Sequence, residues 1–195
     1  MDKFTMAFTE NLLDKKIVQA ADLVKIDYAI SVVKSEFFKT LLLILIFSLM
    51  GLLLPFLLLM AVIAPIRMTT GGIHVNNSWG CFSLSLLFTL LQLVILPCLN
   101  LGAAVYEGIF IISVLMICLL PLAPSQKRAI KTKEKYIRNK CFSCLLCIFW
   151  FIMFHLVVKD SYFIHCGIWA FLMQAIQILY VNVHNKMIKR GISYD

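Results

Sequence analysis

The sequence predicts an all-α membrane protein: a polytopic helical bundle of about six membrane segments, preceded by amphipathic helices on the membrane surface. Hydrophobic residues make up 62% of the chain and charged residues only 14%, whereas soluble domains are about half apolar and about a quarter charged. The apolar residues form long runs, as a lipid bilayer requires of spanning helices. The net charge of +8 is concentrated between such runs, as in the cytoplasmic loops of membrane proteins.

Residues 1–39 are mixed in polarity and precede the first apolar run. Ile17, Ala21, Val24 and Tyr28 recur at helical spacing, with charged residues on the rest of the turn. This pattern predicts amphipathic helices lying on the membrane, with a soluble helical hairpin as the alternative. The segment carries six basic and six acidic residues and has no short apolar core, so it is unlike a cleavable signal peptide.

Residues 40–65 form one apolar run that contains Gly51 and Pro55. As one helix the run would be longer than the hydrocarbon core requires, and Gly and Pro both favour a break. If residues 1–39 and the polar segment 66–78 both face the cytoplasm, the run must cross and return. We therefore predict a short membrane hairpin here, with a single crossing, and five segments in all, as the alternative.

Two helical pairs follow, in residues 79–122 and 141–183. The loop 123–140 between them carries seven basic residues, namely Lys127, Arg128, Lys131, Lys133, Lys135, Arg138 and Lys140. Such a run can indicate nucleic-acid binding, but its apolar flanks favour a cytoplasmic loop under the positive-inside rule. Because each pair crosses and returns, segment 66–78, this loop and the tail 184–195 share the cytoplasmic side. No internal repeat or linker interrupts the chain, so we predict a single membrane domain.

The chemistry is expected in segment 66–78 and at the start of the next helix, because this polar stretch on the cytoplasmic side is not a charge run. Gly71 and Gly72 end the preceding helix and allow a positive φ. The candidates for the N-cap of the next helix are Asn76, Asn77 and Ser78. Any of these caps places Cys81 near the helix N-terminus.

His74 and Cys81 are the candidate catalytic dyad. A helix N-terminus favours a thiolate through the helix dipole and free backbone N–H groups. A histidine can take the thiol proton and later return it to a leaving amine. The two residues are seven apart, so on one straight helix they would lie about 10.5 Å apart along the axis, too far for a hydrogen bond. The dyad therefore requires His74 to lie on the turn before the helix.

Other reactive side chains have simpler interpretations. The seven cysteines lie mostly within apolar runs, and their odd number argues against a disulfide framework. Three of them share a helix face: Cys141, Cys144 and Cys147. With His155 or Cys166 they could bind a metal, but packing is the simpler interpretation, so no metal or cofactor is predicted. His155 either relays protons or makes a helix–helix hydrogen bond. With Pro55, it supports the alternative function, a small transporter or a non-enzymatic membrane scaffold.

The pattern around the candidate dyad resembles a known family. Gly72 lies two residues before His74, small and polar residues and an aromatic lead to Cys81, and Arg67 precedes them. The Ala123–Pro124 pair opens a basic loop between two membrane pairs. With the chain length and the order of segments, these features resemble the accessory gene regulator protein B (AgrB) family over essentially the whole chain. Members of that family are membrane cysteine endopeptidases of bacterial peptide quorum sensing.

The resemblance implies a multi-pass enzyme of the bacterial cell membrane, with its active site on the cytoplasmic side and an AgrD-type propeptide as substrate. Cys81 would attack the peptide bond before the acidic C-terminal tail, while His74 activates the thiol and protonates the leaving amine. An internal thiol or hydroxyl of the propeptide would then attack the acyl-enzyme thioester and close a thiolactone or lactone ring. No third residue that orients His74 is identified.

Supporting roles also follow from the resemblance. Arg67 is expected to hold the acidic tail or a lipid phosphate, with snorkelling toward the headgroups as the alternative. Gly72 is expected to serve the backbone shape. Lys127, Arg128 and Lys131 of the basic loop are expected to attract the acidic tail. Membrane lipid is a further expected partner, nucleic acid is not, and the sequence leaves open whether the protein forms a homodimer.

Overall fold

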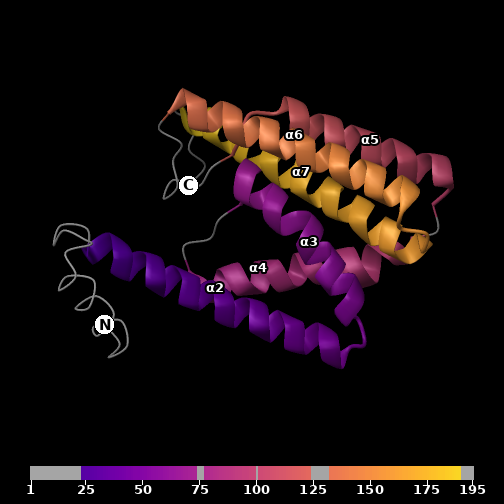
Figure 1. The fold of residues 1–195 in the computed structure, drawn as a ribbon, viewed down its shortest axis with the longest axis horizontal. Helices are drawn as coiled ribbons and strands as arrows, with labels where there is room; N and C mark the ends of the chain where they lie inside the picture. Colours follow the sequence, from indigo (N-terminus) through magenta and orange to yellow (C-terminus); the bar gives the residue numbers. More distant parts are fainter. Residues whose placement is uncertain (1–22, 74–76, 100, 124–131, 190–195) are drawn as a thin grey trace. The chain divides into compact units, whose positions relative to one another are not determined.

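The computed structural model describes residues 23–73, 77–99, 101–123 and 132–189. Within these ranges the regular elements are helical (Figure 1), apart from one isolated parallel bridge between Gly71 and Ala123. The predicted all-α class is therefore confirmed. Several predicted residues lie outside the described ranges, namely Ile17, Ala21, His74, Lys127, Arg128 and Lys131.

Helix α2 (Leu23–Leu49) belongs to the first of two compact units, residues 1–50. It joins the charged end of the predicted amphipathic region to the first part of the predicted hairpin in one continuous helix. No glycine or proline occurs within α2, so nothing interrupts the helix where the composition changes. Near that change, Lys39 Nζ pairs with Glu36 Oε1 at 2.9 Å. Hydropathy thus changes within this helix without ending it.

The helix breaks at Gly51, as predicted. Helix α2 ends at Leu49 and helix α3 begins at Leu53, with Gly51 between them at a φ of 72°. Glycine adopts such a φ readily, whereas a residue with a side chain is strained there. Pro55 lies in the first turn of α3, where its missing N–H breaks no helical hydrogen bond. The break therefore depends on the glycine, and the proline is accommodated at the helix start.

Helix α3 (Leu53–Thr70) opens the second unit, residues 51–195. One face of α3 is buried, and its residues recur every three or four positions, namely Phe56, Leu59, Val62, Ile66 and Thr70. This spacing is that of a helix face turned toward a core. The helix continues five residues beyond the predicted end at residue 65, so the predicted loop 66–78 begins instead at Gly71.

Helix α4 (Ser78–Leu90) continues into a π-helical turn, η2 (Leu91–Ile95), and a 3₁₀ turn, η3 (Leu96–Cys98). Together they give an apolar run from Trp79 to Cys98 that is long enough to cross a membrane. A π-helical turn shifts the backbone hydrogen bonding by one residue. In this turn the Leu93 carbonyl accepts a hydrogen bond of 2.6 Å from the Tyr162 hydroxyl. The contact ties the end of the α4 run to the start of helix α7.

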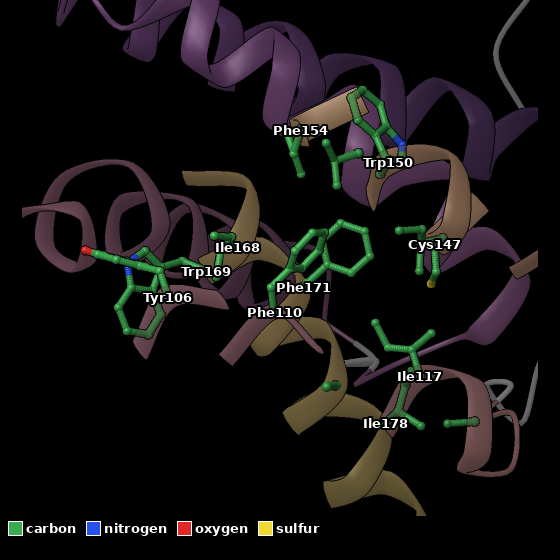
Figure 2. Close-up of a cluster of buried hydrophobic side chains, with 14 residues drawn as sticks. Tyr106, Phe110, Ile117, Cys147, Trp150, Phe154, Ile168, Trp169, Phe171 and Ile178 are labelled. Carbon is green, nitrogen blue, oxygen red and sulfur yellow. The ribbon is translucent and has the colours of Figure 1, made fainter. Parts of the chain in front are cut away.

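Helices α5 (Ala103–Leu119), α6 (Lys133–Leu156) and α7 (Ser161–Lys189) lie side by side, and α3 packs against α6 and α7 (Figure 1). Figure 2 shows their shared core. Phe110 of α5 packs against Phe154 of α6, with ring centroids 5.8 Å apart, and against Phe171 of α7, at 5.1 Å. Both pairs have the edge-to-face arrangement that aromatic quadrupoles favour.

Within the described ranges, four helices are long and apolar enough to cross a membrane: α3, the α4 run, α6 and α7. Helix α5 is a shorter apolar helix. These five correspond to the predicted segments after Gly51, and the sixth predicted segment is the apolar end of α2. Helix α6 begins at Lys133, so residues 133–140, predicted as loop, are helical. Helix α7 likewise extends beyond its predicted end to Lys189.

Polar contacts connect the ends of α3, α5 and α7 and the start of α6 at one end of the second unit. Lys140, in the second turn of α6, donates to the Ile117 carbonyl at 3.0 Å and to the Leu120 carbonyl, both at the end of α5. Asn182, near the end of α7, donates to the Pro121 carbonyl at 2.9 Å. The isolated bridge brings the end of α3 to the same place. The segments that the charge pattern predicts to share the cytoplasmic side therefore meet at one end of the unit.

Candidate functional site

The chain leaves α3 through two glycines. Gly71 follows the last helical residue with a φ of 82°, and its N–H donates to the Arg67 carbonyl at 2.9 Å. Gly72 has a φ of 156°. Residues with side chains rarely adopt either value, because the Cβ atom collides with the backbone. The glycine pair therefore permits the sharp change of direction that begins the candidate catalytic loop.

A parallel bridge ties this segment to the residue after α5. The Ala123 N–H donates to the Thr70 carbonyl at 2.7 Å, and the Ala123 carbonyl accepts from the Gly72 N–H at 3.1 Å. Ala123 is buried. The start of the candidate catalytic loop and the start of the basic loop are thus joined through their backbones. The sequence predicted that these loops share a side of the membrane, but it did not predict this pairing.

Gln174 of α7 holds the same segment from a different helix. Its Nε2 donates to the Thr70 hydroxyl at 2.9 Å and to the Gly71 carbonyl at 2.8 Å. Gln177, one turn further along α7, is also buried. The side-chain oxygens of both glutamines have no hydrogen-bond partner within the described part of the chain. Two polar groups of a membrane-spanning helix therefore face the glycine segment.

Arg67 is folded back onto the loop that follows it. Its Nη2 donates to the Ile73 carbonyl at 2.9 Å. A guanidinium carries five N–H donors in a rigid fork, so a bond of this kind fixes its direction. The contact links Arg67 to the backbone of the loop, which the sequence did not predict. Binding of the acidic tail or of a lipid phosphate by Arg67 stays a prediction.

Gly72 is closely surrounded. A Cβ atom built on it would lie 3.1 Å from Gln177 Oε1 and 3.8 Å from both Arg67 Nε and Gln174 Nε2. Contacts near 3.1 Å are tighter than ordinary van der Waals packing, so a neighbour would have to move. Together with the φ of Gly72, this crowding supports the expected role of the glycine in backbone shape.

Cys81 lies near the N-terminus of α4. Of the three predicted N-cap candidates, Asn77 is the one that caps the helix, since its Oδ1 accepts the Trp79 N–H at 3.2 Å. Helix α4 begins at Ser78, so Cys81 is its fourth residue, one later than a Ser78 cap would give. The Cys81 N–H donates to the Asn77 carbonyl at 2.9 Å, and the side chain is half-buried. Its thiol is therefore at the end of a membrane-spanning helix and partly accessible.

The structure brings together two of the predicted site residues, Arg67 and Gly72, and places Cys81 at the start of the next helix. The remaining predicted residues lie outside the described ranges: His74, Lys127, Arg128 and Lys131. Their roles, and the pairing of His74 with Cys81, stay predictions.

The sequence pattern did not indicate Gln174 and Thr70 as parts of the site. A signal for the glutamine was present, because Gln174 and Gln177 are three residues apart inside a predicted membrane segment. Polar side chains in spanning helices usually face the interior of a bundle. That rule marks the face of the helix, but it does not identify Thr70, which lies 104 residues earlier in the chain, as the partner.

The other polar candidates serve helix packing. His155 Nε2 of α6 lies 3.1 Å from Glu107 Oε1 of α5, and His155 Nδ1 lies 2.8 Å from the Phe151 carbonyl. Of the two interpretations of His155, the structure thus supports a helix–helix hydrogen bond. Cys147 is buried in the core. Within the described ranges, no group of three or more potential ligands is placed to hold a metal ion.

Taken together, the helices and this end of the bundle define an all-helical, multi-pass membrane protein with a half-buried cysteine at the capped start of a spanning helix. The model of the family Accessory gene regulator B (AgrB) matches residues 2–178. The chain therefore belongs to the AgrB family, whose membrane proteins act in the accessory gene regulator quorum-sensing system with AgrD-type propeptides as partners.

A curated relative supports the assignment to the family. An AgrB-like protein from Clostridium beijerinckii is 27% identical over 183 residues, which cover 91% of this chain and 86% of that protein. No solved structure matches this chain.

Proposed function

We propose that this chain is a membrane cysteine endopeptidase that removes the C-terminal tail of an AgrD-type propeptide and promotes cyclisation of the remainder. The observation that carries the proposal is the position of Cys81. The Cys81 side chain is half-buried near the start of the spanning helix α4. Cys81 also lies within residues 2–178, the part of the chain that the AgrB family model matches. The thiol is therefore partly accessible at the end of the helix, where a propeptide bound at the membrane edge could reach it.

The first half of the proposed reaction forms an acyl-enzyme. His74 takes the proton from Cys81 Sγ, and the sulfur attacks the carbonyl carbon of the peptide bond before the tail. The carbon–nitrogen bond then breaks, and the leaving amine takes the proton from His74. The tail departs with its new N-terminus, and the rest of the propeptide is held on Cys81 as a thioester.

The second half closes the ring. A thiol of the bound propeptide attacks the thioester carbon, Cys81 leaves as a thiolate, and the attacking thiol gives up its proton to the site. A hydroxyl would give a lactone by the same steps. Exchange of one thioester for another conserves the bond type, so its free energy change is near zero. Attack by water would instead hydrolyse the acyl-enzyme irreversibly. A site at the membrane edge, with restricted water, suits this requirement.

Basic residues near the loop support substrate capture in this proposal. Lys127, Arg128 and Lys131 would attract the acidic tail of the propeptide. Beyond them, the first turns of α6 expose three further basic side chains, Lys133, Lys135 and Arg138. Helix α6 begins at the end of the unit that holds the Gly71–Ala123 bridge, so the positive charge lies on the same side as the proposed chemistry.

The first test replaces the proposed nucleophile. In proteoliposomes with the cognate propeptide, Cys81→Ala should insert normally and lose cleavage by more than about a thousandfold, together with any trapped acyl-enzyme. Cys98→Ala is the matched control, because Cys98 lies at the other end of the same apolar run and is exposed. Its cleavage rate should equal that of the wild type.

Full cleavage by Cys81→Ala would reject the peptidase proposal and favour the transporter or scaffold alternative. A purified wild-type enzyme in lipid that released mainly linear, hydrolysed product would leave the cleavage step in place and reject the proposed cyclisation.

A further inference from the structure

Gln174 is a fully buried amide on a membrane-spanning helix, 1% exposed. Its Nε2 makes two hydrogen bonds, to the Thr70 hydroxyl at 2.9 Å and to the Gly71 carbonyl at 2.8 Å. A rotated amide would direct its oxygen at the Gly71 carbonyl, so the two bonds fix its orientation. Gln174 lies 103 residues after Gly71 in the chain. The contact is therefore a tertiary one that connects the last described helix to the candidate catalytic loop.

The Gly71–Gly72 segment needs contacts from other parts of the chain to hold its backbone in one conformation. Glycine loses more conformational entropy on ordering than any other residue, and two glycines follow each other here. The bridge to Ala123 holds one edge of the segment, and Arg67 holds the Ile73 carbonyl. Gln174 binds the Gly71 carbonyl between these two contacts. The segment is thus held by bonds from three separate parts of the chain.

We infer that Gln174 is a positioning residue for the reaction proposed above, on which this inference rests. By holding the Gly71 carbonyl, it fixes the backbone at the start of the candidate catalytic loop, three residues before His74 in the sequence. Without the Gln174 bond, the glycine segment would keep only its contacts to Ala123 and Arg67. A catalytic group that is misplaced by about 1 Å can cost roughly 100-fold in rate. Gln174 contacts no reacting atom in this assignment and acts through the loop backbone.

The packing of α7 against α3 does not require the Gln174 amide. Val62 and Ile66 of α3 belong to the same buried apolar cluster as Ala175 and Ile178 of α7. Replacing Gln174 by Met keeps the length of the side chain and removes both hydrogen bonds. The helices should therefore stay packed while the Gly71 carbonyl loses its 2.8 Å hydrogen bond from Gln174.

The test compares Gln174→Met with Gln92→Met, each in the full chain in proteoliposomes. Gln92 is also buried within an apolar membrane run, so it controls for the loss of a buried amide elsewhere. Gln174→Met should insert, unfold near the wild-type temperature, lower kcat for propeptide cleavage by about 10- to 100-fold and leave KM within about twofold. Gln92→Met should keep the wild-type kcat.

A second readout separates positioning from general damage. Alkylation of Cys81 by iodoacetamide, followed by mass spectrometry, reports the reactivity of the thiol without any propeptide. Gln174→Met and His74→Ala should each slow this alkylation, and the double variant should be no slower than His74→Ala alone. Thr70→Val removes one acceptor of Gln174 and the long 3.4 Å hydrogen bond from the Thr70 hydroxyl to the Gly71 carbonyl, but it keeps the 2.8 Å bond from Gln174 to that carbonyl. It should lower kcat in the same direction by a smaller factor, and it carries the test if Gln174→Met fails to insert.

A wild-type kcat in Gln174→Met would overturn the positioning role. The role would also be overturned if Gln174→Met slowed Cys81 alkylation by the same factor in the wild type and in the His74→Ala background. Failure of the proposed function is a separate result, in which Cys81→Ala and His74→Ala cleave the propeptide as the wild type does, and the inference about Gln174 falls with it.

Discussion

Gly72 has little room for a side chain, and its backbone conformation disfavours one. A Cβ atom would lie 3.1 Å from Gln177 Oε1, and φ is 156°. We expect Gly72→Ala to lose about 1–3 kcal/mol of unfolding free energy locally, because strained backbone conformations cost that much. Propeptide cleavage should fall by at least about tenfold, since the strain lies two residues before His74. Cleavage kinetics and thermal unfolding in detergent would measure the two effects.

Gly108→Ala is the matched control for this substitution. Gly108 lies within α5, and apart from its chain neighbours and the nearby backbone of its own helix no atom lies within 4 Å of its Cβ position. The control should keep full cleavage. Equal activity of Gly72→Ala and Gly108→Ala would show that the loop does not need glycine at position 72.

The residues of the candidate site differ in how far the sequence could reveal them. A capped helix start just before Cys81 was predictable, with Asn77 as one of three cap candidates, because a cap and a helix start depend on neighbours a few residues away. Gln174 was not, because its bonds to Thr70 and Gly71 depend on how two distant helices pack. The Arg67 guanidinium was predicted to bind the acidic tail of the propeptide or a lipid phosphate. In the structure it donates a hydrogen bond to the Ile73 carbonyl. Local chemistry can thus be read from the chain, and tertiary partners cannot.

At the level of elements, α6 and α7 make close contact at Gly167. A Cβ atom on Gly167 would lie between 2.2 and 2.9 Å from three ring atoms of Phe154. The ring is buried and packs against Phe110 and Trp150, so it has little freedom to move. We expect Gly167→Ala to destabilise the protein by about 1–3 kcal/mol through overpacking. Thermal unfolding in detergent would measure the loss.

A compensating change tests the cause of that loss. Phe154→Leu removes the ring atoms that a Cβ on Gly167 would meet, so it should cost less in the Gly167→Ala background than in the wild type. Strict additivity of the two substitutions would contradict direct contact between these positions.

The ends of helices were harder to predict than their existence. The apolar runs located α3, α4, α5, α6 and α7 correctly, because a bilayer selects long apolar stretches. Helix α6 nevertheless starts at Lys133, within charged residues that have good helix propensity. Hydropathy therefore reports the depth of a residue in the membrane. Helix termini are instead set by glycines and caps, as at Gly51, Gly71 and Asn77.

For the whole molecule, charge predicts a dependence on salt. The chain carries a net charge of +8, and its basic loop begins next to the bridge at Ala123. The screening length falls from about 10 Å at 0.1 M salt to about 3 Å at 1 M. With liposomes of neutral lipid, added salt should therefore raise KM for an acidic-tailed propeptide several-fold and leave kcat nearly constant.

The triple substitution Lys127→Gln, Arg128→Gln and Lys131→Gln should raise KM at low salt and flatten its dependence on salt. Lys159→Gln is the control, because Lys159 lies between α6 and α7 at the opposite end of the unit. An unchanged KM in the triple variant would show that these bases do not capture the tail.

The bonds of Gly71 also set an order of assembly during synthesis. The membrane helix that carries Cys81 leaves the ribosome well before Ala123, and Gln174 comes later still. Until α7 is inserted, the Gly71 carbonyl lacks its hydrogen bond from Gln174 and the glycine segment is incompletely held. A nascent chain stalled before α7 would therefore carry the cysteine in the membrane without a finished loop. The glycine segment can therefore gain all of its hydrogen bonds only after α7 has been inserted.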